Sequence, residues 1–154
     1  MEFVRYELLM HPQALVELSE LEGDHLKRAA VDTLKDLACG YELPSERLTS
    51  LPEYRRWVNL DLRGLERVRF DVPGSPEPRY HLVYERLPPQ GDRQRPRIHV
   101  VTAGPLPAAE RTRDVAGEMS RRLGREPLPR WQVVQQAQQG GRGAASSFVS
   151  RAAA

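Results

Sequence analysis

The sequence predicts an α+β fold in which two N-terminal helices and a closing C-terminal helix pack on a small antiparallel sheet with a mixed edge. Three observations carry this prediction: short alternating segments in the middle of the chain, leucines at helical spacing before them, and a second helical pattern after them. The chain has 154 residues, 40% of them hydrophobic, which is enough for one ordinary domain. We expect this domain to cover residues 1–124, followed by a C-terminal extension over 125–154.

The chain begins with an imperfectly alternating segment, residues 3–9, that we interpret as a first strand. Pro12 follows, and proline suits the first turn of a helix because its missing N–H has no intrahelical partner there. Leucines at near-helical spacing then predict a first helix from Pro12 to Leu21.

A second helix is predicted from Asp24, which can cap it, to about Ala38. Gly40 suits the left-handed position that ends a helix. The apolar stripe of this helix consists of Leu26, Ala30, Leu34 and Leu37 or Ala38. Residues 41–66 show no clear period, although 57–62 are compatible with an extended segment.

Three alternating segments, residues 67–72, 79–85 and 97–102, predict neighbouring strands. Side chains alternate between the two faces of a strand. One face then carries Val68, Phe70, Val72, Tyr80, Leu82, Tyr84, Ile98 and Val100 toward a core, and the other carries Arg67, Arg69, Asp71, Arg79, His81, Glu85, Arg97 and His99. The loop 88–96 is a hairpin tip, and a closing helix is predicted from Pro107 to Leu123.

The second face gathers guanidinium and imidazole groups, which would suit a polyanion such as RNA. An alternative interpretation is equally simple, because an antiparallel sheet normally exposes one face and fills it with charge. The charge along the chain is uneven: residues 1–46 hold ten acidic and four basic side chains, whereas 47–154 hold 11 acidic and 19 basic ones. This asymmetry indicates an anionic partner for the later part of the chain.

Several other classes of function find no support in the sequence. Cys39 is the single cysteine, so no intrachain disulfide is expected, and no Cys/His spacing resembles a zinc site. We therefore expect no metal and no cofactor. No apolar run approaches a membrane span and no secretion pattern is visible, so a cytoplasmic protein without a membrane partner is expected.

The basic face permits metal-free RNA cleavage, in which a base takes the proton of a ribose 2′-hydroxyl and cations stabilise the attacked phosphate. Arg67 and Arg69 would stabilise the transition state, because a guanidinium pairs with two phosphate oxygens. His81 would be the general base or acid, with a reference pKa of about 6.5. Glu85 would orient or replace it. The residues predicted to position RNA are Arg79, Arg97, His99, Arg111 and Arg113.

The chain resembles the RelE/ParE family of bacterial toxins over about residues 3–124. The motifs that carry the resemblance are Gly64-Leu-Glu-Arg-Val-Arg-Phe70, Tyr80-His-Leu-Val-Tyr84, Ile98-His-Val-Val-Thr-Ala-Gly-Pro105, Asp114-Val-Ala116 and Ser120-Arg-Arg-Leu123. The resemblance implies a RelE-like fold and a toxin of a toxin–antitoxin system. Such a toxin is an endoribonuclease that cleaves mRNA on the ribosome and is held inactive by a cognate antitoxin.

Two positions depart from the family pattern. The arginine that follows Gly-Pro in the family is Leu106 here, and the catalytic tyrosine falls on Ala116. Arg111 or Arg113 could supply the missing charge, but neither replaces a phenol. Two other functions therefore stay open: a protein of this fold that inhibits a protein target such as gyrase, and a non-toxic binding module.

Few apolar groups remain after about residue 138, so disorder is expected there.

Overall fold

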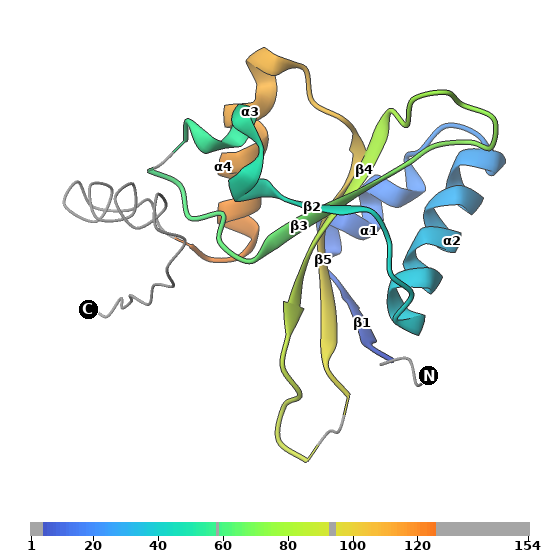
Figure 1. Ribbon diagram of the computed structural model, residues 1–154, viewed down its shortest axis with the longest axis horizontal. Helices are drawn as coiled ribbons and strands as arrows, with labels where there is room; N and C mark the ends of the chain where they lie inside the picture. The colour runs from blue at the N-terminus through green and yellow to red at the C-terminus, as the bar shows by residue number, and fades with distance from the viewer. Residues whose placement is uncertain (1–4, 58, 93–94, 126–154) are drawn as a thin grey trace.

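The protein folds around a five-stranded mixed sheet with helices on both sides, as a computed structural model describing residues 5–57, 59–92 and 95–125 shows (Figure 1). The elements follow one another as β1 (Glu7–Met10), α1 (Pro12–Ser19), α2 (Asp24–Cys39), β2 (Ser45–Arg47), the 3₁₀ turn η1 (Leu48–Ser50), α3 (Pro52–Arg55), β3 (Leu65–Phe70), β4 (Tyr80–Leu87), β5 (Arg97–Pro105), the 3₁₀ turn η2 (Ala109–Arg111) and α4 (Thr112–Arg122). The α+β class and the mixed edge of the sheet are confirmed.

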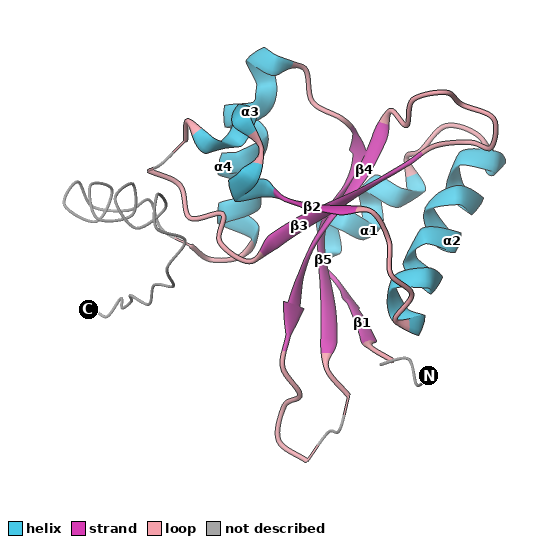
Figure 2. Ribbon diagram, in the orientation of Figure 1, coloured by secondary structure: helices cyan, strands magenta, loops and turns pink. Residues whose placement is uncertain are grey.

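The strands lie in the order β1-β5-β4-β3-β2, and only the β1–β5 pair is parallel (Figure 2). The strand that begins the described fold thus pairs with the last one. Both edge strands are short, with four residues in β1 and three in β2. Short edges offer few unpaired backbone groups to another chain.

The two N-terminal helices begin and end where the sequence predicted, within two residues. Pro12 occupies the first turn of α1, and the Nδ1 atom of His11 accepts a hydrogen bond from the backbone N–H of Gln13 (3.1 Å). Gly40 ends α2 with a φ of 82°, the left-handed conformation that glycine adopts without steric cost.

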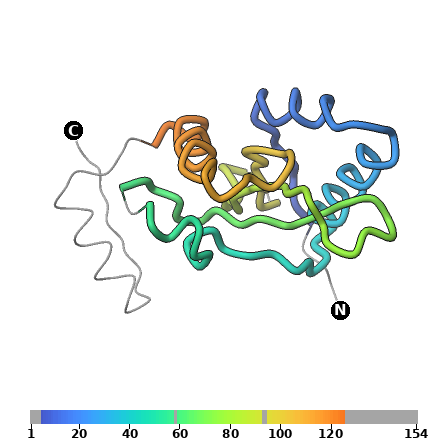
Figure 3. The backbone as a smooth tube through the Cα atoms, turned by 90° about the horizontal axis from the view of Figure 1, so that it is seen from above, coloured from blue at the N-terminus to red at the C-terminus, as the bar shows by residue number. Residues whose placement is uncertain are grey.

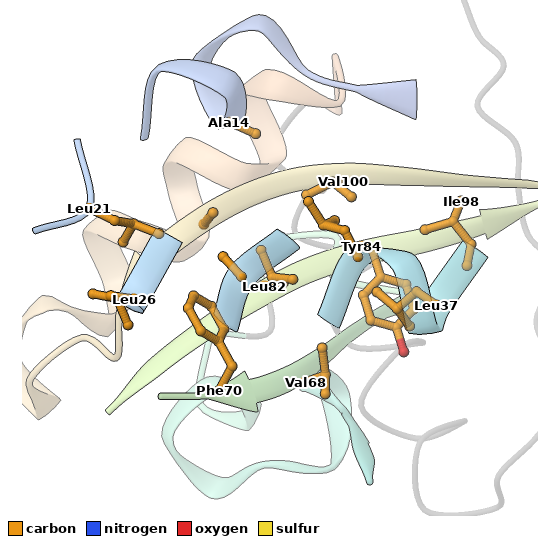
Figure 4. Packing of buried hydrophobic residues seen from close by; sticks show 13 residues of the cluster. Ala14, Leu21, Leu26, Leu37, Val68, Phe70, Leu82, Tyr84, Ile98 and Val100 are labelled. Carbon is orange, nitrogen blue, oxygen red and sulfur yellow. The ribbon is translucent and has the colours of Figure 1, made fainter. Parts of the chain in front are cut away.

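One core lies between the sheet and the helices α1 and α2 (Figure 4). Its members from α2 lie on one helical stripe, and those from the strands, apart from Ala103, are residues that alternation assigned to the core face. They are Ala14, Leu21, Leu26, Ala30, Leu34, Leu37, Val68, Phe70, Leu82, Tyr84, Ile98, Val100 and Ala103, with Val72 and Tyr80 partly buried against them. The predicted inward face of the sheet is therefore confirmed.

The other side of the sheet is covered as well. A second core joins η1, α3 and α4 to the sheet and consists of Leu48, Tyr54, Leu62, Leu65, Val83, Val101, Ala116 and Met119. Figures 1 and 3 place α3 and α4 away from α1 and α2, with the strands between. The sequence predicted that this face of the sheet is open to a nucleotide. The prediction was wrong for the part of the face that η1, α3 and α4 cover.

Several boundaries differ from those predicted. The first strand begins at Glu7, while part of the predicted range 3–9 lies outside the described residues. The described residues of 57–62 form turns and no strand, because the chain folds back over the second core there. The short strand β2 was not predicted. The C-terminal extension, with its predicted disorder, lies outside the described residues.

A bulge in β5 allows one strand to serve both cores. Val83 pairs with Thr102, whereas the next residue, Tyr84, pairs with Val100, so Val101 is left without a partner across the ladder. An extra residue of this kind bends a strand and changes the face that a side chain occupies. Val100 accordingly belongs to the first core and Val101 to the second.

An ion pair between α1 and α4 covers the edge of β5 beyond the end of β1. The Glu17 carboxylate accepts hydrogen bonds from the Thr102 hydroxyl (2.9 Å) and the Ala103 N–H (3.2 Å). The Arg122 guanidinium donates to both oxygens of Glu17 (2.8 and 2.9 Å) and to the carbonyl of Val101 (3.0 Å). These contacts satisfy backbone groups that would otherwise be unpaired.

Candidate functional site

The β3–β4 register brings three of the predicted catalytic residues together. Arg69 lies directly opposite His81, and Arg67 lies opposite Val83, two positions further along the same face. We call Arg67, Arg69 and His81 the upper cluster. This convergence was predicted from alternation, but the exposure of the three side chains differs greatly.

Arg67 is held inside the protein by two carboxylates. The residue is 6% exposed, and its guanidinium contacts Glu46 Oε1 (3.2 Å) and Glu53 Oε1 (3.4 Å). The hydroxyl of Tyr54 is buried next to this group. Burial raises the pKa of Tyr54, and the nearby charge of Arg67 opposes this rise. The Arg67 guanidinium is therefore committed to the fold.

His81 is almost completely buried, with 2% of its surface exposed. Its Nδ1 atom has no hydrogen-bond partner among the described residues. Burial, and secondarily the positive charge of Arg67, lowers the pKa of His81 to about 4. The ring is therefore neutral at neutral pH, and it has no direct access to a substrate hydroxyl.

Arg69 is the accessible member of the upper cluster. Its side chain is 44% exposed, and its Nε atom lies 3.2 Å from Glu46 Oε1. Glu46 is the same carboxylate that Arg67 contacts, so one acid is shared between two guanidinium groups. The positive charge of Arg69 is thus only partly balanced locally.

Glu85 and His99 form a separate group further along the strands. Glu85 is four residues from His81 on β4, which corresponds to about 13 Å along a strand. Its carboxylate contacts His99 Nδ1 (2.9 Å) and Arg125 Nη2 (3.4 Å). The predicted role of Glu85 in orienting His81 is therefore wrong in this geometry, because Val83 of the second core lies between them.

Three other predicted RNA contacts are dispersed. Arg79 lies just before β4 and pairs with Asp71 (2.9 Å), and Arg97 donates to the carbonyl of Pro88 (3.3 Å) and to Gln90 (3.2 Å) near the hairpin tip. Arg111 lies before α4 and is only loosely paired with Asp114 (3.8 Å). These side chains do not join the upper cluster.

Arg113 belongs to an assembly that the sequence interpretation missed. Its Cζ atom lies 5.6 Å from the ring centroid of Trp57, and the Cζ atom of Arg56 lies 5.4 Å from the same centroid. The indole N–H donates to the Thr112 hydroxyl (3.3 Å). The sequence did contain a signal for this assembly, because two arginines directly precede the tryptophan at 55–57. Basic residues beside an aromatic one are typical of nucleic-acid contacts.

The two positions that depart from the toxin pattern lie in different surroundings. Ala116 is fully buried in the second core, so this position faces Met119 and its neighbours and not the solvent. Leu106 is half-buried and donates its backbone N–H to the carbonyl of Arg79 (2.8 Å). A phenol in contact with RNA is therefore not available from position 116.

No family model, curated protein or solved structure matches this chain. Within the described ranges, no group of three or more metal-ligating side chains gathers. No helix in the described part of the chain is long and apolar enough to cross a membrane.

Proposed function

We propose that the protein is a toxin of RelE/ParE type that acts by binding RNA through arginines on the α3–α4 side of the sheet. One observation carries the proposal: exposed guanidinium groups without a carboxylate partner among the described residues occur at the end of α3 and on α4, two helices that contact each other. They are Arg55, Arg56 and Arg113. Unbalanced exposed arginines attract a phosphate backbone.

The distribution of charge supports RNA on this side and a different partner on the other. Residues 48–57 carry two basic side chains and one acidic one, whereas residues 12–39, which hold α1 and α2, carry three basic and six acidic ones. A phosphate backbone is repelled by a net negative surface and steered toward a net positive one. The two sides of the sheet therefore suit partners of opposite charge.

Binding is better supported than cleavage through His81. A general base must come within hydrogen-bond reach of the proton that it removes, and His81 lies beneath the second layer with 2% exposure. Arg69 is the member of the predicted catalytic set that RNA can reach. We therefore assign RNA contact to exposed arginines and a structural role to His81.

The RNA-binding proposal predicts a salt-dependent interaction with single-stranded RNA. The full chain should bind a short fluorescent RNA, and log K should fall linearly with log salt because counterions are released. The double variant Arg55→Ala/Arg69→Ala removes two exposed guanidinium groups from this side and should bind several-fold more weakly. The control Lys27→Ala/Arg28→Ala removes the same charge from α2 and should bind like the wild type. Fluorescence anisotropy over a range of salt concentrations measures both.

Absence of binding at physiological salt would contradict the proposal, as would an equal loss in the α2 control. The same samples, kept with a metal chelator and ribosome-bound mRNA, report on RNA integrity. We expect the RNA to stay intact while translation is inhibited. Cleavage that disappears in both Arg69→Ala and His81→Leu would instead establish the metal-independent endoribonuclease.

We further propose that a cognate antitoxin covers α1 and α2. Large apolar side chains are exposed there: Leu15 by 54%, Val16 by 46% and Val31 by 44%. Exposed apolar surface on a folded protein is typical of a partner site. Both helices lie on the other side of the strands from α3 and α4 (Figure 1). An antitoxin bound to α1 and α2 would therefore not compete directly with RNA for the α3–α4 side.

The antitoxin proposal predicts that the product of an adjacent small reading frame co-purifies with the chain. Leu15→Asp should abolish co-purification, because it places a charge in the apolar contact while leaving the core intact. Thermal unfolding of the isolated variant checks that its fold is retained. Association that survives Leu15→Asp would contradict this site, and capture of gyrase in place of the small partner would favour a gyrase inhibitor.

A further inference from the structure

Two guanidinium groups from different helices lie over one indole ring on the α3–α4 side. Arg56 directly follows α3, and Arg113 is the second residue of α4. Their Cζ atoms lie 5.4 and 5.6 Å from the ring centroid of Trp57, within the range of cation–π attraction. One short segment of a ligand can therefore meet both groups.

The ring that supports these arginines is itself anchored. Trp57 packs partly against the second core, and its N–H donates to Thr112, a residue with 1% exposure. The Thr112 hydroxyl in turn donates to the carbonyl of Ala109 (3.0 Å). The indole is thus attached to α4, and the arginines gain a rigid flat support between α3 and α4.

The two arginines have no carboxylate partner among the described residues, in contrast to Arg67, Arg79 and Arg122, each of which pairs with an acid. Both residues are exposed. A guanidinium that stacks on an aromatic face keeps its N–H groups free in its own plane. Those edges are the groups that pair with two oxygens of a phosphate.

We propose that Arg56 and Arg113, held over Trp57, form a two-arginine clamp for the backbone phosphates of single-stranded RNA. This inference rests on the proposed RNA binding and names the contact within it. The clamp reads phosphate and not base sequence, because guanidinium contacts to the backbone carry no sequence information. Its stacked arrangement reduces the ordering that each arginine must undergo on binding.

The test compares three variants of the full chain by anisotropy with a labelled single-stranded RNA. Arg56→Ala/Arg113→Ala should weaken binding at least 10-fold and reduce the slope of log K against log salt by about 1.4, because each phosphate contact on a single strand contributes about 0.7. Trp57→Leu keeps both charges, so it should weaken binding several-fold with an unchanged slope. Lys27→Ala/Arg28→Ala is the charge-matched control and should behave like the wild type.

Two outcomes would overturn the clamp, and they differ from failure of the RNA-binding proposal. If the wild type binds RNA but Arg56→Ala/Arg113→Ala keeps its affinity and slope, RNA binding stands and the clamp falls. If Trp57→Leu equals the wild type while its thermal midpoint is retained, the indole does not organise the arginines. If the wild type binds no RNA, both proposals fall.

Discussion

Because of His81, the free energy of unfolding of the wild-type protein is expected to fall by about 3 kcal/mol between pH 6.5 and pH 4. His81→Leu should abolish this loss. Burial lowers the pKa of this imidazole to about 4 in the folded protein, against the ordinary value of 6.5 in an exposed chain. Between these two pH values the unfolded chain binds a proton that the folded chain does not. Each pH unit in this window therefore lowers the free energy of unfolding by about 1.4 kcal/mol.

The loss of stability occurs on the acidic side of pH 6.5. Above pH 6.5 the stability contributed by a neutral His81 is fully present, and it is lost as the pH falls toward 4. The leucine variant has no proton to bind and also removes a buried nitrogen without a partner, so it should be as stable as the wild type at pH 7 or slightly more stable. Urea unfolding at pH 7, 5.5 and 4.5 measures the difference.

A matched control is available on α2. His25→Leu makes the same substitution at an exposed position and serves as the control for the change of side chain itself. If His81→Leu shows the same acid dependence as the wild type, the imidazole must gain a proton in the folded protein, and water must reach it. That result would reopen a role for His81 in proton transfer.

Arg122→Ala is expected to lower the free energy of unfolding by about 3 kcal/mol. The side chain is 9% exposed and contacts both oxygens of Glu17, the Val101 carbonyl and Glu118. Its removal would leave Glu17 as a partly buried carboxylate without its main counterion and would expose the edge of β5. For a domain of this size the melting temperature should fall by about 10 °C, which differential scanning calorimetry can measure.

The neighbouring residue offers the control. Arg121 also pairs with Glu118 (2.7 Å), but its side chain is 71% exposed. Exposed ion pairs contribute little, so Arg121→Ala should change stability by no more than about 0.5 kcal/mol. Equal effects of the two substitutions would contradict the claim that the Glu17–Arg122 pair holds α1 and α4 to the sheet.

The same ion pair should be visible in the pH dependence. Burial tends to raise the pKa of Glu17, but hydrogen bonds from Arg122, the Ala103 N–H and Thr102 outweigh this effect, so the pKa lies below its ordinary value of 4.5. A lowered carboxyl pKa contributes stability above pH 4.5 that is lost as the pH falls through the folded value. Arg122→Ala should reduce this component, which begins at the acidic end of the pH window of His81 and extends below it.

The alternation of β3, β4 and β5 was sufficient to predict which side chains face the first core. Val68, Phe70, Leu82 and Val100 all lie there, because an extended chain has no freedom to choose another face. The stripe on α2 and the left-handed Gly40 followed from equally local rules.

Alternation could not predict what covers the opposite face. His81 and Arg67 lie on that face as predicted, yet they are buried, because the segment 48–62 and α4 fold over them. That segment carries leucines, a tyrosine and a tryptophan without any period, so it shows no secondary-structure signal. The contact between Arg113 and Trp57 likewise joins residues more than fifty positions apart.

The sequence by itself determined the class of the fold, the helices α1 and α2 and the face of each central strand, since these follow from backbone geometry and local periodicity. Only the tertiary structure decided which arginines are exposed to a ligand. Exposure depends on which distant segments pack together, and guanidinium groups on one sheet face can be buried beside a carboxylate, as Arg67 is, or left in solvent over an indole, as Arg56 and Arg113 are.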